Sequence, residues 1–221
     1  YLPDQILTNY DLEKIVDTSH DWIFERTGIN ERHIAEKDES SVDMAYHASL
    51  KCIEKSKISI NDIDMIVFAT STPERVFPSS AVLLQNKLNI KNSFAFDVNA
   101  ACTGFIFALD VADKYIKNKS ASNVLVVGAE KMSSIIDWKD RNTCVLFGDG
   151  SGAVILSVSE SPGIISSTIG SNGSYKDLLT VNPDSDFIEM KGNDVFKIAV
   201  NTMGKLAKDT LNSNNLSIDQ I

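Results

Sequence analysis

The sequence predicts an α/β protein in which helices cover both faces of a largely parallel sheet. Helical and strand patterns alternate along most of the chain, and such alternation is typical of parallel sheets built from βαβ units. The predicted strands are short runs that are apolar at nearly every position, such as Ile63 to Ala69 and Val124 to Ala129. Such runs indicate strands that are buried on both faces. A chain of 221 residues, 43% of them hydrophobic, is long enough to bury this kind of core.

Cap residues and helical spacing predict the helices in the first part of the chain. Thr8 is a favoured N-cap residue and opens a short helix through Asp17. Ser40 opens a longer helix that runs to about Ser56. Residues at helical spacing form the inner face of this longer helix: Val42, Ala45, Ser49, Cys52 and Ile53. A third helix is predicted from Ser79 to Leu88.

Cys102 lies where a strand pattern changes into a helix pattern. Ser93 to Val98 predicts a short buried strand, and helical spacing follows from Phe105 to Ile116. A thiol in the first turn of a helix faces unpaired backbone N–H groups, which lower its pKa and can hold a developing oxyanion. The small residue Gly104 is expected to allow close approach of the helix to the strand. The local sequence leaves a nucleophile and a small buried cysteine equally open.

The second part of the chain carries weaker patterns. Thr143 to Phe147 and Ala153 to Val158 predict two strands. The glycine-rich segment Gly148 to Gly152 lacks the lysine of a phosphate-binding loop and predicts a tight turn between them. Pro162 to Pro183 has glycines and serines throughout and indicates a connecting excursion, before a helical pattern from about Val195 to Asn212.

Charge and composition exclude several classes of function. The net charge of −9 argues against general binding of nucleic acid or of an anionic membrane surface. The chain has no apolar run of about eighteen residues and no signal-peptide pattern, so a cytoplasmic location is expected. Its three cysteines are too few for a disulfide framework. No metal site is expected, because His20, His33 and His47 show no ligand spacing.

Three motifs in order resemble those of β-ketoacyl-acyl-carrier-protein synthase III, which has the thiolase fold. They are Asp21 to Ile29, the stretch around Cys102, and Phe147 to Ala153, and the resemblance extends over nearly the whole chain. It implies an acyltransferase that initiates fatty acid synthesis. A short acyl group passes from acyl-CoA to Cys102 and condenses with malonyl-acyl-carrier protein, giving β-ketoacyl-acyl-carrier protein, CoA and CO2. The resemblance implies no cofactor, since acyl-CoA is a substrate.

The same resemblance implies binding roles for residues that composition alone would leave on the surface or in the core. Trp22 would stack on the adenine of CoA with Arg141 on the opposite side, whereas by itself Trp22 could equally be a core anchor. Thr18 and Arg26 would lie near the phosphates of CoA. Gly192 and Phe196 would lie along the pantetheine channel, and Lys197 with Lys191 would dock the carrier protein. Phe77 would close the acyl pocket of the neighbouring subunit in a homodimer, or pack on its own core.

A short internal match predicts a duplicated fold. Ser59 to Ile63 follows one predicted helix, and the similar Ser217 to Ile221 follows another. The resemblance therefore implies a thiolase-like α-β-α-β-α layered fold whose second half is largely missing from this chain. The expected division is 1–158 for the first half, 159–192 for a connecting excursion and 193–221 for the start of the second half. The histidine and asparagine that assist the cysteine in the family are expected to lie outside this chain.

Two other classes remain open from the sequence. One is another thiolase-fold condensing enzyme that acts on acyl-CoA, similar to HMG-CoA synthase or to the quinolone-type enzymes. The other is a non-catalytic acyl-binding subunit. The presence of Cys102 argues against the second class, because the non-catalytic partners in related systems replace the nucleophile.

Overall fold

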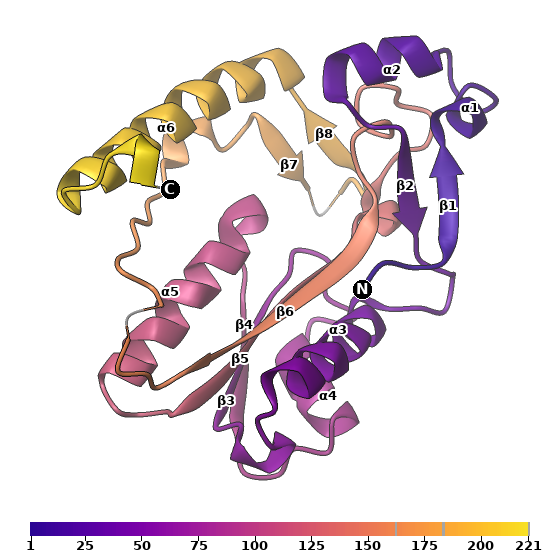
Figure 1. The fold of residues 1–221 in the computed structure, drawn as a ribbon. Helices are drawn as coiled ribbons and strands as arrows, with labels where there is room; N and C mark the ends of the chain where they lie inside the picture. The colour runs from indigo at the N-terminus through magenta and orange to yellow at the C-terminus, as the bar shows by residue number, and fades with distance from the viewer. Residues whose placement is uncertain (162, 183, 221) are drawn as a thin grey trace. The chain divides into compact units, whose positions relative to one another are not determined.

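The computed structural model describes residues 1–161, 163–182 and 184–220. The chain divides into two compact units, of which unit 1 comprises Tyr1–Val158 and unit 2 begins at Ser159. Figure 1 shows the order of the elements along the chain. The assignment of unit 2 to the start of a second, repeated half stays a prediction.

Unit 1 is built on a four-stranded sheet in the order β4-β3-β5-β6. The strands β4 (Phe94–Val98), β3 (Met65–Ala69) and β5 (Asn123–Lys131) are parallel, and β6 (Asp149–Ser157) is antiparallel to β5. Every residue of β3 is buried, as the continuous apolar run predicts for a central strand covered on both faces. The predicted largely parallel sheet is therefore present.

Helices cover both faces of this sheet (Figure 1). Helices α3 (Ser41–Ser56) and α4 (Ser80–Lys87) pack on the face that carries Ile66 and Phe68. Helix α5 (Gly104–Lys117) packs on the opposite face, which carries Met65 and Val67. Neighbouring residues of β3 thus contribute to two separate clusters, because side chains alternate along a strand.

The N-terminal part forms a small layer of its own. Strands β1 (Gln5–Thr8) and β2 (Glu31–Ile34) pair antiparallel, and α1 (Asn9–Leu12) and α2 (His20–Thr27) lie between them in sequence. Thr8 is the N-cap of α1, as predicted, and forms a capping box with Asp11. The predicted helix through Asp17 is too long, because Ser19 caps a second helix and the chain must turn before it.

The segment before β6 corrects two further predictions. Thr143 to Phe147 is not a strand: residues 141–146 form turns, in which the Asp140 carboxylate accepts hydrogen bonds from Asn142 N at 3.0 Å and Thr143 Oγ1 at 2.9 Å. Such side-chain bonds compete with strand pairing. The glycine-rich segment is not a tight turn, because β6 already begins at Asp149 and pairs with β5 throughout. The predicted strand from Ala153 is the second part of β6.

Unit 2 contains a short antiparallel pair, β7 (Leu179–Val181) and β8 (Ile188–Met190), and the long helix α6 (Gly192–Ser213). The predicted helix is present and begins earlier than Val195. The two segments of the internal match, Ile60–Asp62 and Ile218–Gln220, both form a 3-10 helix after a long α-helix. This similarity supports a repeat. Pro162, Pro183 and Ile221, which bound the predicted excursion and the second match, lie outside the described residues.

Candidate active site

Cys102 lies between β4 and α5, in a 3-10 turn of Ala101–Thr103. The α-helix begins only at Gly104, so the thiol precedes the first turn in which the sequence places it. The side chain of Cys102 is exposed, whereas Cys52 is half-buried and Cys144 is buried. Burial raises the pKa of the Cys52 and Cys144 thiols. Cys102 is therefore the cysteine most open to a substrate.

The turn that carries Cys102 is both tight and strained. A Cβ at Gly104 would lie 3.3 Å from Cβ of Ala69 and 3.8 Å from the carbonyl oxygen of Val98, which is the close approach that the sequence predicts. Ala101, directly before the thiol, has φ of 45°. A residue with a Cβ in this left-handed region is strained by about 1–2 kcal/mol, and strain of this kind is concentrated at functional sites.

A cavity of about 370 Å³ opens at Cys102. Its walls come from the carboxyl end of β3 at Ala69, from Phe105 on α5, from residues 128–130 of β5 and from residues 150–152 of β6. Small side chains leave the room, and a Cβ at Gly128 would crowd Phe105, with Cδ2 at 3.1 Å. The glycine-rich segment thus lines the cavity through Gly150, Ser151 and Gly152.

Glu130 is a charged wall residue of this cavity that the sequence analysis missed. Its carboxylate accepts hydrogen bonds from Ser71 N at 2.7 Å and Thr72 Oγ1 at 2.6 Å. The sequence position of Glu130 could have indicated its place near the site. Glu130 directly follows the buried run of β5, and the carboxyl ends of parallel strands lie at the same edge of a sheet, where ligands bind. The acid, on β5, and the thiol, in the turn after β4, thus lie at one cavity.

Trp22 on α2 is brought together with two arginines. The Cζ atoms of Arg26 and Arg141 lie 4.5 Å and 4.6 Å from the centroid of its ring. Arg26 Nη1 also donates to the carbonyl of Trp22 at 3.2 Å, and Arg141 Nη1 donates to the carbonyl of Asp17 at 2.9 Å. Trp22 is half-buried, while its neighbour Ile23 is fully buried. The indole is thus a platform beside two positive charges rather than the core anchor of this helix.

Thr18 precedes α2 and has a buried Oγ1 without a hydrogen-bond partner in the part of the chain that the structure describes. A buried hydroxyl without a partner is costly. Trp22, Arg26 and Arg141 form a group suited to an anionic, planar ligand, and Thr18 lies just before the helix that carries Trp22.

Comparison with known proteins identifies the family. A model described as 3-oxoacyl-[acyl-carrier-protein (ACP)] synthase III matches residues 96–173. A β-ketoacyl-[acyl-carrier-protein] synthase III from Thioalkalivibrio sulfidiphilus is 49% identical over 100% of this chain and 72% of its own length. One from Methylococcus capsulatus is 52% identical over 98% of this chain and 70% of its own length. The chain belongs to the β-ketoacyl-acyl-carrier-protein synthase III family.

Solved structures agree with this membership. The 3-oxoacyl-[acyl-carrier-protein] synthase III from Aquifex aeolicus matches 100% of this chain and 71% of its own, with a TM-score of 0.96 and 46% sequence identity. The synthase III from Thermus thermophilus matches with a TM-score of 0.95 and 37% identity. The predicted thiolase-like fold class is confirmed, and the protein is a condensing acyltransferase. The relatives have the name of the synthase III family rather than of either alternative class.

Four residues to which the resemblance gives binding roles, in the pantetheine channel or in carrier-protein docking, lie together at the beginning of α6. Lys191 precedes the helix, Gly192 is its first residue, and Phe196 and Lys197 follow. Lys191, Phe196 and Lys197 are exposed. They belong to unit 2, so their roles toward Cys102 stay predictions.

Phe77 lies in the loop between β3 and α4 of the synthase, with 81% of its surface exposed, and the preceding Val76 is 92% exposed. Packing of Phe77 on its own core, the alternative that the sequence left open, is therefore wrong for this structure. An exposed phenylalanine next to an exposed valine is typical of a contact surface.

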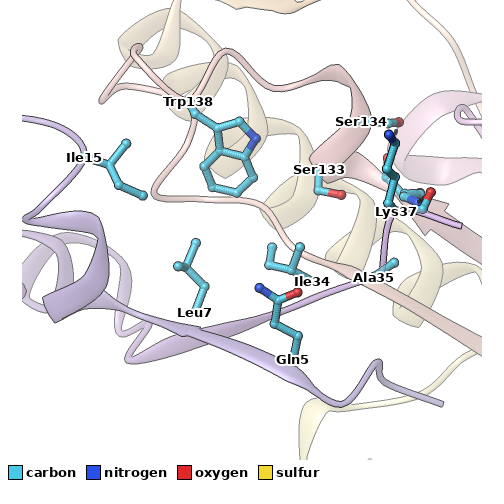
Figure 2. Close-up of a pocket in the computed structure, with 10 residues that line it drawn as sticks. Gln5, Leu7, Ile15, Ile34, Ala35, Lys37, Ser133, Ser134 and Trp138 are labelled. Atoms are coloured by element: carbon cyan, nitrogen blue, oxygen red, sulfur yellow. Dashed lines mark hydrogen bonds between the residues drawn. The ribbon is translucent and has the colours of Figure 1, made fainter. Parts of the chain in front are cut away.

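A second cavity, of about 460 Å³, lies on the β1–β2 pair (Figure 2). Figure 2 shows the indole of Trp138 across the cavity from Leu7 and Ile34. Lys131 is fully engaged at its edge, since Nζ donates to the carbonyls of residues 36, 37 and 39 at 2.7, 3.1 and 2.6 Å. Neither Cys102 nor a residue expected to bind substrate lines this cavity. The Cys102 cavity is therefore the candidate active site.

The described residues contain neither a helix long and apolar enough to cross a membrane nor a cluster of His, Cys, Asp and Glu that could hold a metal ion. The cytoplasmic location stays a prediction.

Proposed function

We propose that this synthase III initiates fatty acid synthesis through an acyl-enzyme on Cys102. The observation that supports this role is the exposed thiol at a strained strand-to-helix turn, facing a cavity whose wall holds small residues and Glu130. Acetyl-CoA or another short acyl-CoA is the acyl donor, and malonyl-acyl-carrier protein is the extender.

The reaction proceeds in two steps. The Cys102 thiolate attacks the thioester carbonyl of acyl-CoA, the bond from that carbonyl to the CoA sulfur breaks, and CoA leaves as a thiolate. The malonyl group then loses CO2, and the resulting enolate forms a carbon–carbon bond to the acyl carbonyl. The bond to Cys102 breaks in this step and the thiolate is restored. No cofactor is consumed.

The acylation step tests the proposal. Incubation with radiolabelled acetyl-CoA is expected to label the protein on Cys102. Cys102→Ser should remove the label, and Cys52→Ser is the matched control that should retain it. Labelling of Cys52 or Cys144 in the wild-type protein would contradict the proposal.

We infer that Trp22, Arg26, Arg141 and Thr18 bind CoA. The indole supplies a stacking surface, the guanidinium groups supply positive charge for the phosphates, and the Thr18 hydroxyl lacks a partner in the described chain. An adenine between Trp22 and Arg141 needs a separation of about 7 Å, which is two contact distances of about 3.5 Å, so Arg141 must move from its present 4.6 Å when CoA binds. Gly192 and Phe196 are proposed to lie along the pantetheine channel.

Trp22→Ala should raise the KM for acetyl-CoA about tenfold with little change in the rate at saturation, because stacking contributes to binding rather than to chemistry. Phe24→Ala is the matched control, since Phe24 is an exposed aromatic residue on the same helix. Steady-state kinetics of acylation measure both. An unchanged KM for Trp22→Ala would remove Trp22 from the CoA site.

Lys197 and Lys191 are proposed to dock the acidic carrier protein, because an acidic chain needs a local basic surface to attract an acidic partner. Lys197→Glu should slow the step with malonyl-acyl-carrier protein and reduce its salt dependence, while acylation by acetyl-CoA is spared. Lys205→Glu, also exposed on α6, is the control. Equal loss in both steps would indicate a structural role for Lys197.

A cytoplasmic homodimer is the proposed working form, with β4 near the two-fold axis and Phe77 in the partner's acyl pocket. The partly exposed apolar edge strand β4 and the exposed Phe77 support it. Mixed dimers provide a test. In a mixed dimer whose one subunit carries both Cys102→Ser and Phe77→Ala, the surviving thiol receives the altered side chain, so primer preference should shift toward longer acyl-CoA. With the two changes in opposite subunits, the surviving thiol receives the unaltered Phe77, and the preference should not shift. A monomer in sedimentation equilibrium at micromolar concentration would overturn the dimer.

A further inference from the structure

The loop that carries Phe77 is attached at both ends to carboxylates from neighbouring strands. It leaves β3 through residues 70–72 and enters α4 at Ser80. The two carboxylates belong to Glu130 on β5 and Asp97 on β4, the strands on either side of β3. Strand β4 leads into the turn that carries Cys102, and β5 lines the Cys102 cavity.

Glu130 holds the start of the loop. Its carboxylate accepts from the backbone N–H of Ser71 at 2.7 Å and from the Thr72 hydroxyl at 2.6 Å. The Thr72 hydroxyl in turn accepts from the backbone N–H of Lys131 at 2.8 Å. Thr72 is buried, so this part of the loop is fixed to the end of β5, and Glu130 itself lines the Cys102 cavity.

Asp97 holds the end of the loop. Its two carboxylate oxygens accept from the backbone N–H groups of Ser80 at 2.8 Å and Ala81 at 2.7 Å. These are the first two N–H groups of α4, which have no partner within the helix. An anion at a helix N-terminus forms charge-assisted hydrogen bonds, which are stronger than neutral ones. Asp97 is also on the strand that leads directly to Cys102.

The loop is exposed between these two attachments. Residues 73–78 are all exposed, and the two apolar side chains at its tip have exposed fractions of 92% for Val76 and 81% for Phe77. Within the chain itself, the position of the tip therefore depends on how its ends are held.

We propose that Asp97 and Glu130 are positioning residues that fix the Phe77 loop and thereby set the acyl-chain selectivity of the enzyme. This inference rests on the proposed function, in which Phe77 closes the acyl pocket of the partner subunit. With both ends fixed, the phenyl ring occupies one position and limits the length of the acyl group. With one end released, the ring moves and longer groups are accepted.

Selectivity is measured as the ratio of kcat/KM for butyryl-CoA to that for acetyl-CoA in acylation of Cys102. Phe77→Ala should raise this ratio about tenfold, and Asp97→Asn should raise it about threefold through loss of the charged acceptor. Asp64→Asn is the matched control, because the Asp64 carboxylate also accepts two backbone N–H groups, of Ser122 and Asn123, at the opposite end of the sheet. Its ratio should not change.

The double variant Asp97→Asn/Phe77→Ala separates positioning from a general structural effect. If Asp97 acts through Phe77, the double variant should have the same ratio as Phe77→Ala alone. An unchanged ratio in Asp97→Asn, a shift in Asp64→Asn of equal size, or additive effects in the double variant would overturn the proposal.

Trypsin cleavage after Arg75 provides a measure that needs no enzyme activity. Asp97→Asn and Glu130→Gln should each speed this cleavage about fivefold relative to cleavage after the exposed Lys119 in the same molecule, whereas Asp64→Asn should not. Wild-type rates in both variants would show that the carboxylates do not hold the loop. If the wild-type protein takes no label from acetyl-CoA, the proposed function fails, and the cleavage rates still decide whether the loop is held.

Discussion

Cys102 and Cys144 are two thiols in the same unit with opposite surroundings. Cys102 is exposed on a strained turn among small residues, whereas Cys144 is fully buried in a turn whose chain is held by Asp140 and by the Arg32 guanidinium. Burial raises the pKa of Cys144, although Arg32 lies nearby. For Cys144, burial outweighs the nearby positive charge of Arg32, so access and backbone geometry are the features that distinguish Cys102 as the proposed nucleophile.

The largest expected effect separates the two thiols by function. Cys102→Ser should lower acylation by acetyl-CoA by about a thousandfold or more, because the nucleophile is lost. Cys144→Ala should retain acylation within about twofold once the folded fraction is taken into account. Comparable losses of acylation in the two variants would remove the distinction.

Alkylation by iodoacetamide tests the comparison without any substrate. At pH 8 the folded protein should be modified at Cys102 about a hundredfold faster than at Cys144, because burial blocks the reagent and the raised pKa of Cys144 keeps that thiol protonated. In concentrated urea the two rates should converge. Peptide mass spectrometry measures each site, and equal rates in the folded protein would contradict the comparison.

The glycines beside the two thiols should differ in their tolerance of a methyl group. A Cβ at Gly148 would lie 2.9 Å from Cβ of Arg32 and 3.1 Å from the carbonyl oxygen of His33, whereas a Cβ at Gly104 meets Ala69 at 3.3 Å. Gly148→Ala should therefore cost about 1–3 kcal/mol in the free energy of unfolding, and Gly104→Ala less. Urea denaturation measures both, and the reverse order would show that β2 moves more easily than the Cys102 turn.

The smallest expected effect concerns the strain at Ala101. Ala101→Gly should change the free energy of unfolding by less than about 0.5 kcal/mol, because relief at φ of 45° offsets the added freedom of the unfolded chain. Ala108→Gly, at a buried position within α5, should cost about 1 kcal/mol or more. A similar cost at both positions would indicate that the Cys102 turn stores no strain.

Local patterns were enough to predict the central elements of unit 1. Apolar runs predicted β3, β4 and β5, and caps with helical spacing predicted α3, α4 and α5, because these signals lie within a few residues of the atoms that they order. Cys102 and the small residues around it are contiguous in the sequence for the same reason, so the candidate nucleophile was visible as well.

Patterns failed where partners distant in sequence decide the structure. The pairing of β1 with β2 was not predicted, since the two strands are four residues long and are separated in sequence by α1 and α2. Thr143 to Phe147 was predicted as a strand, but its backbone bonds to groups other than a neighbouring strand, such as Arg32, whose Nη2 donates to the carbonyl of Val145 at 3.0 Å. Hydrophobicity shows that a segment is buried and does not show its backbone conformation.

By itself, the sequence determined the alternation of helices and strands, the strand-to-helix position of Cys102 and the family motifs, because each depends on neighbouring residues. Only the tertiary structure decided that Glu130 faces the same cavity as Cys102, that Arg141 stacks on Trp22, and that the Phe77 loop ends on two carboxylates. These contacts join strands and loops far apart in the chain. Their geometry follows from the order in which the sheet places its strands, which no local pattern specifies.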